Sequence, residues 1–373
     1  MARQDRRAFI SASIGGTLLA SAASGPNLAA VSKPFRGRAY EVGEQKSIDT
    51  LRRVDRSWAA PGPGMALVEV HVSAIAARDI GIVSSRFLGS KRPELVPLSE
   101  GAGRVVAVGS QVANVKVGDR VTAGHFGSWV DGPWTPANYA ADIGNEIDGW
   151  LADYALLPAS ALAIIPDNLS YEDAGVISGS GVTAWHALHV VAGVRSGETV
   201  LTLGTGGVST IGLQLAKLAG ARVVVTSSSD EKLERMRGLG ADLTANYRSN
   251  AAWGEQVLKL TGGRGVDIVL ENVGRETLDQ SMLACANNAR IVMIGTGPLP
   301  KELPKMPGFY MKNLMMKAIS NGSVRMLQDL MRAMSASGTK SVIDKVYPFE
   351  QAVEAFEFMR GSNHIGKVAI RHR

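Results

Sequence analysis

The alternation of short apolar runs with amphipathic stretches after about Pro166 constrains the fold of this chain more than any other feature. The apolar runs include VLTLG, RVVVT, VDIVLE and RIVMIG. Between them lie stretches such as VSTIGLQLAKLAG, in which Ile211, Leu215 and Leu218 fall on one face of a helix. Buried strands separated by amphipathic helices are typical of a doubly wound parallel sheet, so we expect an α/β fold in this part of the chain.

The strand-like run Thr199–Leu203 leads directly into the glycine-rich sequence LGTGGVSTIG. Gly204 and Gly206 occupy the first two positions of a G-x-G-x-x-G pattern, and Ser209 occupies the third. In this pattern the first glycine makes a tight turn, the second lets the backbone approach a pyrophosphate, and the third eases helix packing. Helix amides from Val208 onward would face the anion. A plain glycine-rich turn is the alternative, but the strand before the turn and the helix and second strand after it favour a dinucleotide site.

The next strand-like run ends in SSSDEK, where a dinucleotide site distinguishes NAD from NADP. An NAD site places an acidic residue near this point to bind the ribose hydroxyls, whereas here Ser227 stands there and Lys232 follows one turn on. Hydroxyls and a cation suit a 2′-phosphate, and Tyr247 and Arg248 are expected to close over the adenine end. Alternatively, the serines only cap the following helix and Asp230 is the ribose ligand. We expect NADP(H) to be preferred, with NAD(H) as the alternative.

The sequence before Pro166 has a different pattern. Apolar residues alternate along Met65–Ser73, and PLSEGAGRVVAVGSQVANVKVGDRV is typical of short strands joined by glycine turns. Residues 125–150 lack periodicity and are expected to form a long functional loop. Strand character returns at Lys367–Ile370, so we expect the chain to rejoin its first domain after the α/β portion.

The first residues of the chain have the features of an export signal. Arg6 and Arg7 are followed by Phe9-Ile10, a weakly apolar stretch and the small residues Ala20-Ser21-Ala22. This arrangement resembles a bacterial twin-arginine signal and predicts a periplasmic protein; a disordered tail with two chance arginines, and hence a cytoplasmic protein, is the alternative. We expect four segments: a signal at 1–30, a β-domain at 31–165, a nucleotide-binding domain at 166–320 and a return to the β-domain at 321–373.

Composition limits the partners of this chain. The formal net charge is +6, but the basic residues form no long run and accompany no reading motif, so nucleic-acid binding is not expected. No run of 18 apolar residues occurs, so stable membrane insertion is not expected either. Cys285 is the only cysteine, which excludes an intramolecular disulfide and a cysteine-rich zinc lobe. We therefore expect the partner to be a small-molecule substrate.

Several stretches together resemble the medium-chain dehydrogenase/reductase superfamily, in particular its zinc-free alcohol dehydrogenase and quinone oxidoreductase-like branch. They are SEGAGRVVAVG, VKVGDRV, GVTAWHAL, LTLGTGGVS, SSSDEKLERMRGLGAD, NYR, LTGGRGVDIVLENVG and GKVAI, and they extend from about residue 60 to the end of the sequence. The resemblance implies a GroES-like β-domain interrupted by a Rossmann domain. It also implies a homodimer formed through the Rossmann domain, along Ile291–Ile294 or Met316–Ile319.

The same resemblance assigns cofactor-binding residues. Thr183 matches a position beside the nicotinamide riboside, and Asn272 and Gly295 match positions on the nicotinamide side. Lys367 matches a residue that borders the cofactor. The other matches are the pyrophosphate positions Gly204, Gly206, Gly207 and Val208, and the 2′-phosphate positions Ser227, Lys232 and Tyr247.

Zinc-containing members of the superfamily have a cysteine, a histidine and a cysteine where this sequence has Ala76, Ser99 and Gly179. None of the three suits zinc, which binds thiolate, imidazole or carboxylate ligands. Asp79 and Glu100 remain at their family positions but cannot form a metal site by themselves. His186 and His189 are spaced to share a helical face, yet no third ligand lies nearby in the sequence. We expect no metal.

Without zinc, hydroxyls, amides or a cation have to stabilise the charge that develops on the substrate oxygen during hydride transfer. The predicted catalytic residues are Ser99, Arg78 and Asp79, and further candidates in the long loop are His125, Trp129 and Tyr139. A structural alternative is that Ser99 caps a turn and that Arg78 pairs with Glu100 or Asp79. Zinc-free relatives chiefly position the acceptor carbonyl, so a single essential acid is not required.

Three functions remain open from the sequence. The first is an NADPH-dependent reductase of a quinone, an enone or an aldehyde. The second is a zinc-free alcohol dehydrogenase that works in either direction. The third is a cofactor-binding protein without turnover that serves as a sensor or structural partner.

Overall fold

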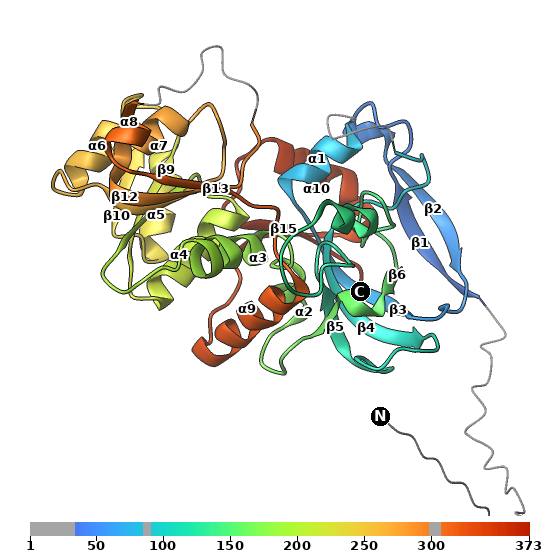
Figure 1. Ribbon diagram of the computed structural model, residues 1–373. Coiled ribbons are helices and arrows are strands. Elements are labelled where there is room, and N and C mark those ends of the chain that lie inside the picture. Colours follow the sequence, from blue (N-terminus) through green and yellow to red (C-terminus); the bar gives the residue numbers. More distant parts are fainter. Residues whose placement is uncertain (1–33, 85–90, 298–306) are drawn as a thin grey trace, which may run out of the picture. The chain divides into compact units, whose positions relative to one another are not determined.

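The structure, a computed structural model, describes residues 34–84, 91–297 and 307–373. The expected signal segment lies outside these residues. Two large sheets dominate the described part, one with six strands and one with seven (Figure 1). The six-stranded sheet is parallel and the seven-stranded sheet is largely antiparallel, which confirms the expected α/β fold of a GroES-like β-domain interrupted by a Rossmann domain.

The parallel sheet has the strand order β10-β9-β8-β11-β12-β13, in which the order reverses beside the first strand, β8. Ligands of doubly wound sheets bind outside the carboxyl ends of the strands at such a switch point. The strands are β8 (Thr199–Leu203), β9 (Arg222–Ser227), β10 (Leu243–Asn246), β11 (Val266–Glu271), β12 (Cys285–Met293) and β13 (Met315–Ala318). The connecting helices are α4 (Gly207–Leu218), α5 (Asp230–Gly238), α6 (Trp253–Leu260), α7 (Leu278–Ala284) and α8 (Pro307–Met311).

Successive apolar residues of the parallel strands are buried on opposite faces of the sheet. Val200 packs in one core and Leu201 in another, and Val223 and Val224 divide in the same way. Because side chains alternate along a strand, a continuous apolar run needs cover on both faces. The crossover helices provide this cover, which explains why these strands carry unbroken apolar runs.

The antiparallel sheet takes strands from both ends of the described chain. Strand β15 near the C-terminus pairs with β3, so Val368 lies opposite Ile75, and β14 adds to β15 in parallel (Figure 1). The sheet has the order β14-β15-β3-β4-β5-β7, with β6 also paired to β3. Its strands are β3 (Met65–Ile75), β4 (Glu100–Val108), β5 (Arg120–Ala123), β6 (Tyr154–Pro158), β7 (Leu162–Ile164), β14 (Ile343–Pro348) and β15 (Lys367–Arg371).

Shorter elements connect and cover the two sheets. A separate hairpin-like pair consists of β1 (Phe35–Glu41) and β2 (Arg52–Trp58). The remaining helices are α1 (Ala77–Val83), α2 (Tyr171–Gly175), α3 (Ser180–Trp185), the π-helical turn His186–Val191, α9 (Val324–Ser337) and α10 (Ala352–Arg360). Short 3₁₀ turns lie at Ile48–Thr50, Pro136–Ala141, Ala159–Ala161 and Phe349–Gln351.

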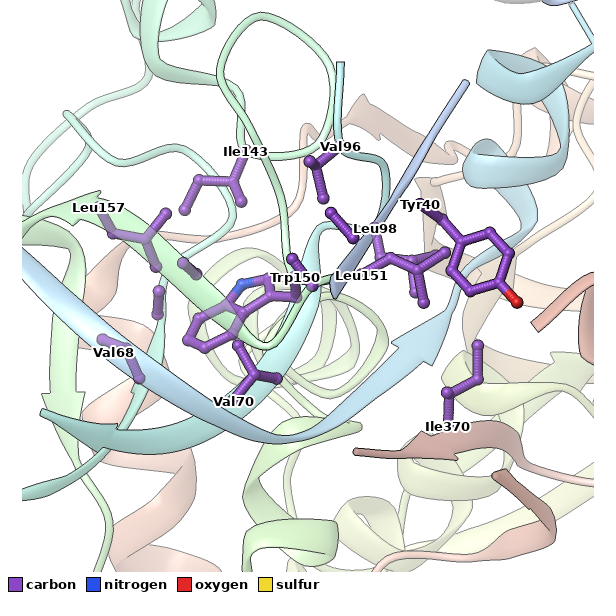
Figure 2. Close-up of a cluster of buried hydrophobic side chains, with 14 of the residues drawn as sticks. Tyr40, Val68, Val70, Val96, Leu98, Ile143, Trp150, Leu151, Leu157 and Ile370 are labelled. Carbon is purple, nitrogen blue, oxygen red and sulfur yellow. The ribbon is translucent and has the colours of Figure 1, made fainter. Parts of the chain in front are cut away.

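The core of the β-domain surrounds Trp150, which is fully buried (Figure 2). Val68 and Val70 of β3 and the aliphatic side chains of the neighbouring loops lie around its indole ring (Figure 2). The ring leaves no room for a side chain at residue 101, since a Cβ atom on Gly101 would lie 2.5 Å from Trp150 Cδ2. The long loop that the sequence leaves without periodicity thus ends in the main core residue of the domain.

Two features bear on partners. Strand β12 lies between β11 and β13, whereas β13 forms the edge of the parallel sheet, so of the two segments expected at a dimer interface only Met316–Ile319 reaches that edge. In the described ranges, no helix combines the length and the apolar character needed to cross a membrane.

Candidate functional site

The turn between β8 and α4 has the geometry of an anion cradle. Gly204 has a φ of +77°, and its N–H donates to Thr226 O over 2.9 Å, so the turn is fixed to the neighbouring strand β9. Gly206 precedes the first turn of α4 and has no side chain that could cap the helix amides. The N–H groups at the start of α4 therefore have no side-chain cap and lie at the positive end of the helix. Such an end binds phosphate groups.

Close packing behind the turn explains a further glycine. A Cβ atom on Gly207 would lie 2.5 Å from Lys367 Cδ and 2.8 Å from Ser180 Oγ. The turn is also tied to the start of β15, because the Gly366 N–H donates to Thr205 O over 2.8 Å. The C-terminal segment of the β-domain therefore supports the glycine-rich turn from outside the Rossmann domain.

Asn272 joins the glycine-rich turn to the next strand of the sheet. Its Nδ2 donates to Ser209 Oγ over 2.9 Å and to Leu203 O over 3.2 Å, and the Ser209 hydroxyl itself donates to Leu203 O over 2.8 Å. Gly295 packs behind this residue, since a Cβ atom there would lie 2.2 Å from Asn272 O. Ser209 stands at the third glycine position of the motif, where only a packing role was expected. It instead takes part in a polar network that holds the turn.

The carboxyl end of β9 carries the residues expected at the 2′-phosphate. Ser227 is buried, its Oγ accepts from the Ser229 N–H over 3.3 Å, and its carbonyl accepts from the Tyr247 N–H over 3.0 Å. The Tyr247 side chain is partly exposed. Lys232 Nζ donates to Ser362 O over 2.7 Å, and burial lowers the pKa of this lysine. The structure thus places Ser227 and the backbone of Tyr247 together at one end of the sheet, whereas the ammonium group of Lys232 is bound to Ser362 of the C-terminal segment.

Ser229 and Asp230, for which helix capping and ribose binding were the alternative roles, make different hydrogen bonds. Ser229 does cap α5, because its Oγ accepts from the Lys232 N–H over 3.3 Å. Asp230, the possible ribose ligand, instead accepts a 2.8 Å hydrogen bond from Asn246 Nδ2 and begins α5. Capping therefore involves Ser229 and leaves the hydroxyl of Ser227 at the strand end.

A buried ion pair underlies the cofactor-side residues. Lys367 Nζ lies 2.6 Å from Glu100 Oε2 and donates to Ile75 O over 2.9 Å. The other carboxylate oxygen, Glu100 Oε1, accepts from the Ser180 N–H over 2.7 Å. Glu100 thereby connects β4, β15 and the start of α3. Sequence reasoning placed Lys367 at the cofactor and offered Arg78 as a possible partner of Glu100, whereas the structure pairs Glu100 with Lys367 and Arg78 with Asp142.

Thr183 lies in α3, one turn after the Glu100 contact. The residue is buried, and its hydroxyl donates to Gly179 O over 2.8 Å. Gly179 has no space for a side chain, because a Cβ atom there would lie 2.0 Å from Glu100 Oε1. Gly179, at the position where zinc-containing members of the superfamily have a cysteine, therefore makes room for the Glu100 carboxylate.

The predicted catalytic residues fall into two groups. Ser99 and Asp79 are fully buried, and within the described residues neither Ser99 Oγ nor Asp79 Oδ1 has a hydrogen-bond partner. Asp79 Oδ2 accepts from the Ala76 N–H over 2.7 Å. Burial raises the pKa of Asp79 to about 6, against the opposing effect of the neighbouring Arg78 charge. Asp79 is thus a carboxyl group that can hold a proton close to neutral pH.

Arg78 belongs to a second, charged group. Its two terminal nitrogens each lie 2.9 Å from an oxygen of Asp142, and Nη1 also contacts His125 Nε2. Burial acts to raise the pKa of Asp142, but its hydrogen bonds and charge interactions with His125 and Arg78 prevail and hold that pKa well below its usual value. Sequence reasoning named Arg78 and His125 as candidates but missed Asp142, which binds both.

The long loop also contributes an aromatic wall, formed by Phe126, Trp129, Trp134 and Tyr139. The Trp129 ring lies 5.8 Å from the His186 ring, centroid to centroid. The loop is fixed to α9, since the Val324 N–H donates to Trp129 O over 3.0 Å. The loop therefore packs against the π-helical turn His186–Val191 and against α9.

The positions that hold zinc in related proteins offer few ligand atoms here. Ala76 and Gly179 have no donor atom, and Ser99 has one hydroxyl. His186 and His189 have separate surroundings, since His186 Nδ1 lies 2.6 Å from Asn321 O and the His189 ring contacts the Trp185 ring in a tilted arrangement. Where the structure describes the chain, no group of three histidine, cysteine, aspartate or glutamate residues is placed to hold a metal ion.

Two family models match the chain. One, described as an alcohol dehydrogenase GroES-like domain, matches residues 62–167. The other, described as a zinc-binding dehydrogenase, matches residues 207–336. The first match spans β3 to β7 of the antiparallel sheet, and the second begins at the start of α4 and spans β9 to β13 of the parallel sheet.

Similar proteins extend over most of the chain. A zinc-type alcohol dehydrogenase-like protein of Schizosaccharomyces pombe is 39% identical over 317 residues, which cover 83% of this chain and 91% of that protein. A crystal structure described as an NAD-dependent alcohol dehydrogenase is 30% identical, with a TM-score of 0.82 over 90% of this chain and 100% of that one. A quinone oxidoreductase of Pseudomonas syringae pv. Tomato DC3000 is 26% identical, with a TM-score of 0.76 over 90% and 100% of the two chains.

Proposed function

The chain belongs to the medium-chain dehydrogenase/reductase superfamily of oxidoreductases, and we propose that it transfers hydride between NADP(H) and a small carbonyl, enone or quinone substrate without zinc. The glycine-rich turn fits a dinucleotide, because the uncapped amides of α4 lie at the switch point of the parallel sheet. The similarity to both alcohol dehydrogenases and a quinone oxidoreductase supports this range of substrates.

The observation that carries the choice of NADP(H) is the end of β9. A buried serine, Ser227, stands where an NAD site has a carboxylate, and Lys232 adds a cation nearby. The nearest acidic residue, Asp230, is bound to Asn246. NAD(H) remains the alternative, since a similar protein is described as NAD-dependent.

Donor chemistry supports the absence of a catalytic zinc. Ala76 and Gly179 supply no ligand atom, and Glu100 already binds Lys367 and the Ser180 N–H. Zinc sites are built from thiolates, imidazoles and carboxylates, so this set does not fit the metal. We therefore assign no step to zinc.

Different residues of the chain have different roles in the proposed hydride transfer. When bound, NADPH supplies the hydride. The amides at the start of α4 would hold its pyrophosphate, and Thr183, by family position, would lie beside the nicotinamide riboside. Asp79 holds a proton at its carboxyl group in a buried environment, and the aromatic wall would keep water from the acceptor.

The test is cofactor-dependent activity of the purified protein lacking the signal segment. We expect NADPH oxidation, followed by absorbance, with at least one member of a panel of quinones, enones and aldehydes. We also expect the protein to prefer NADPH over NADH. Elemental analysis should find less than about 0.1 zinc ion per chain. Equal use of NADH would refute the cofactor choice, and stoichiometric zinc would refute the zinc-free mechanism. Binding of NADPH without turnover of any substrate would favour the sensor alternative.

We also propose a homodimer formed through β13. This strand is an edge of the parallel sheet, and Tyr310, Met311 and Met315 beside or within it are exposed large side chains. Unpaired edge strands and exposed apolar groups are typical of surfaces that pair with another chain. Light scattering on wild type and on Met311→Glu tests this proposal, and a wild-type monomer at micromolar concentration would refute it.

Export is the remaining proposal from the sequence. The twin arginine of residues 1–30 supports delivery of a folded, cofactor-loaded protein to the periplasm. Fractionation of the native host, with Arg6→Lys and Arg7→Lys together as the signal-deficient control, tests it. Full-length, uncleaved protein found in the cytoplasm alone would refute it.

A further inference from the structure

A histidine of the C-terminal segment lies against the glycine-rich turn and has no role in the function proposed above. His364 is located two residues before Gly366, in the turn that leads into β15. Its Nε2 atom lies 4.0 Å from the point that a Cβ atom on Gly206 would occupy. The side chain is 8% exposed, and within the described residues its Nδ1 has no hydrogen-bond partner. This is an unsatisfied, buried polar group next to the uncapped end of α4.

The backbone around His364 is fixed to the turn that it faces. Gly366 forms a parallel bridge with Gly206, and its N–H donates to Thr205 O over 2.8 Å. Gly366 has a φ of +77°, and a Cβ atom there would lie 2.1 Å from Val342 O, so another residue cannot replace it without displacing the segment. The imidazole is therefore held in place before any ligand arrives.

The charged groups around His364 are mostly cationic. Lys367 of β15 and Lys232 of α5 both act to lower its pKa, and only Asp344 of β14 acts in the opposite direction. Asp344 is itself paired with Arg235 of α5 over 3.0 Å. Burial is the main cause of the shift, and the pKa of His364 falls to about 4. The free protein thus holds a neutral imidazole in a region of positive potential.

We propose that His364 binds the cofactor pyrophosphate and takes up a proton when the cofactor binds. The inference rests on the proposed function, because it requires a dinucleotide at the glycine-rich turn. Two negative phosphate groups beside Nε2 would stabilise the imidazolium and raise the pKa of His364 from its value in the free protein. The proton comes from solvent, and the protonated imidazole donates a hydrogen bond to a phosphate oxygen.

This proposal makes cofactor affinity depend on pH in a defined direction. Above the low pKa of the free histidine, binding adds a proton, so affinity increases as pH falls from neutral toward 5. The 2′-phosphate of NADP has a pKa near 6 of its own and tends to lose its proton beside cations. For this reason the difference between wild type and a His364 variant, measured with the same ligand, isolates the histidine.

The experiment is titration calorimetry of NADP⁺ and NAD⁺ at pH 6.0 in two buffers of different ionisation enthalpy. The protein is the chain without its signal segment. We expect wild type to take up at least about 0.3 proton per cofactor more than His364→Gln, and the variant to bind about tenfold more weakly. A second variant, His364→Lys, carries a permanent positive charge at this position. At pH 8 we expect it to recover most of the cofactor affinity that His364→Gln loses, without proton uptake. His71→Gln is the matched control, since His71 also has a pKa lowered by burial but stacks on Tyr171 in the β-domain.

The outcomes separate this inference from the function on which it rests. Equal affinity and equal proton uptake in wild type and His364→Gln, with NADP⁺ bound by both, would overturn the role of His364 and leave the oxidoreductase proposal standing. Weak binding by His364→Gln and His364→Lys alike, with no difference in proton uptake from wild type, would show a packing role and also overturn it. Failure of wild type to bind either cofactor would refute the proposed function and this inference together.

Discussion

Glu100 and Lys367 form an ion pair over 2.6 Å in which both side chains are almost completely removed from solvent. The lysine stem packs against Gly207 of the cofactor turn, and the carboxylate also accepts from the Ser180 N–H. One pair of charges therefore joins two strands of the β-domain to the first residues of α3 and α4. The motifs SEGAGRVVAVG and GKVAI, which contain Glu100 and Lys367, are far apart in the sequence and come into contact here.

Removing the acidic partner should leave a buried, uncompensated lysine. We expect Glu100→Gln to lower the free energy of unfolding by about 3–5 kcal/mol, because it leaves the Lys367 ammonium buried without its charge partner. Urea denaturation at pH 7.5 measures the effect. The control is Glu146→Gln, which removes an exposed partner of Lys91 and should change stability by less than about 1 kcal/mol. A loss at Glu100 no larger than the control loss would contradict the structural role of the pair.

The cofactor turn should not tolerate a methyl group at Gly207. We expect Gly207→Ala to weaken NADPH binding by at least about tenfold, because the new Cβ atom would displace Lys367 or Ser180 from behind the turn. The quenching or enhancement of NADPH fluorescence on binding measures this affinity. Gly238→Ala is the control, since nothing lies within 4 Å of a Cβ atom there and Gly238 is the last residue of α5. NADPH binding as tight in Gly207→Ala as in the control would show that the turn adapts.

The sequence predicted the parts of the site that depend on local pattern. The apolar runs predicted β8 and β9, and the glycine spacing predicted the turn that begins α4. Both follow from short-range geometry, because strand burial and positive φ values restrict residue type at fixed positions. The strand character of the C-terminal residues suggested that β15 returns to the β-domain, and the family resemblance predicted the same return.

The interactions that complete the site could not be predicted in this way. Asp142 binds Arg78 from the long loop, where no periodicity fixes the position of any side chain. Likewise, the contact of Asp230 with Asn246 depends on how two loops at the end of the sheet approach each other. Such pairs are set by tertiary packing between segments far apart in sequence, so single-residue character gives no signal for the partner.

The buried carboxyl of Asp79 should make stability depend on pH. Its pKa is raised to about 6 in the folded protein, so folding favours the protonated form. The stabilisation is therefore fully present below the unfolded pKa of about 4 and is lost as pH rises through about 6. Asp79→Asn has no such proton, and we expect it to gain about 2 kcal/mol relative to wild type between pH 4.5 and pH 7.5. Urea denaturation at both values tests this, and a constant difference between the two proteins would contradict the raised pKa.

The end of β9 should decide cofactor preference. We expect Ser227→Asp to lower the ratio of kcat/KM for NADPH to that for NADH by at least about 100-fold, because a carboxylate there repels the 2′-phosphate and binds ribose hydroxyls. Lys232→Gln should weaken NADPH by about tenfold and leave NADH nearly unchanged, since it removes only a phosphate-binding cation. Lys259→Gln, at an exposed position in the last turn of α6, is the control and should alter neither cofactor. Steady-state kinetics with one substrate and both cofactors measures all three variants, and an unchanged ratio in Ser227→Asp would place the 2′-phosphate elsewhere.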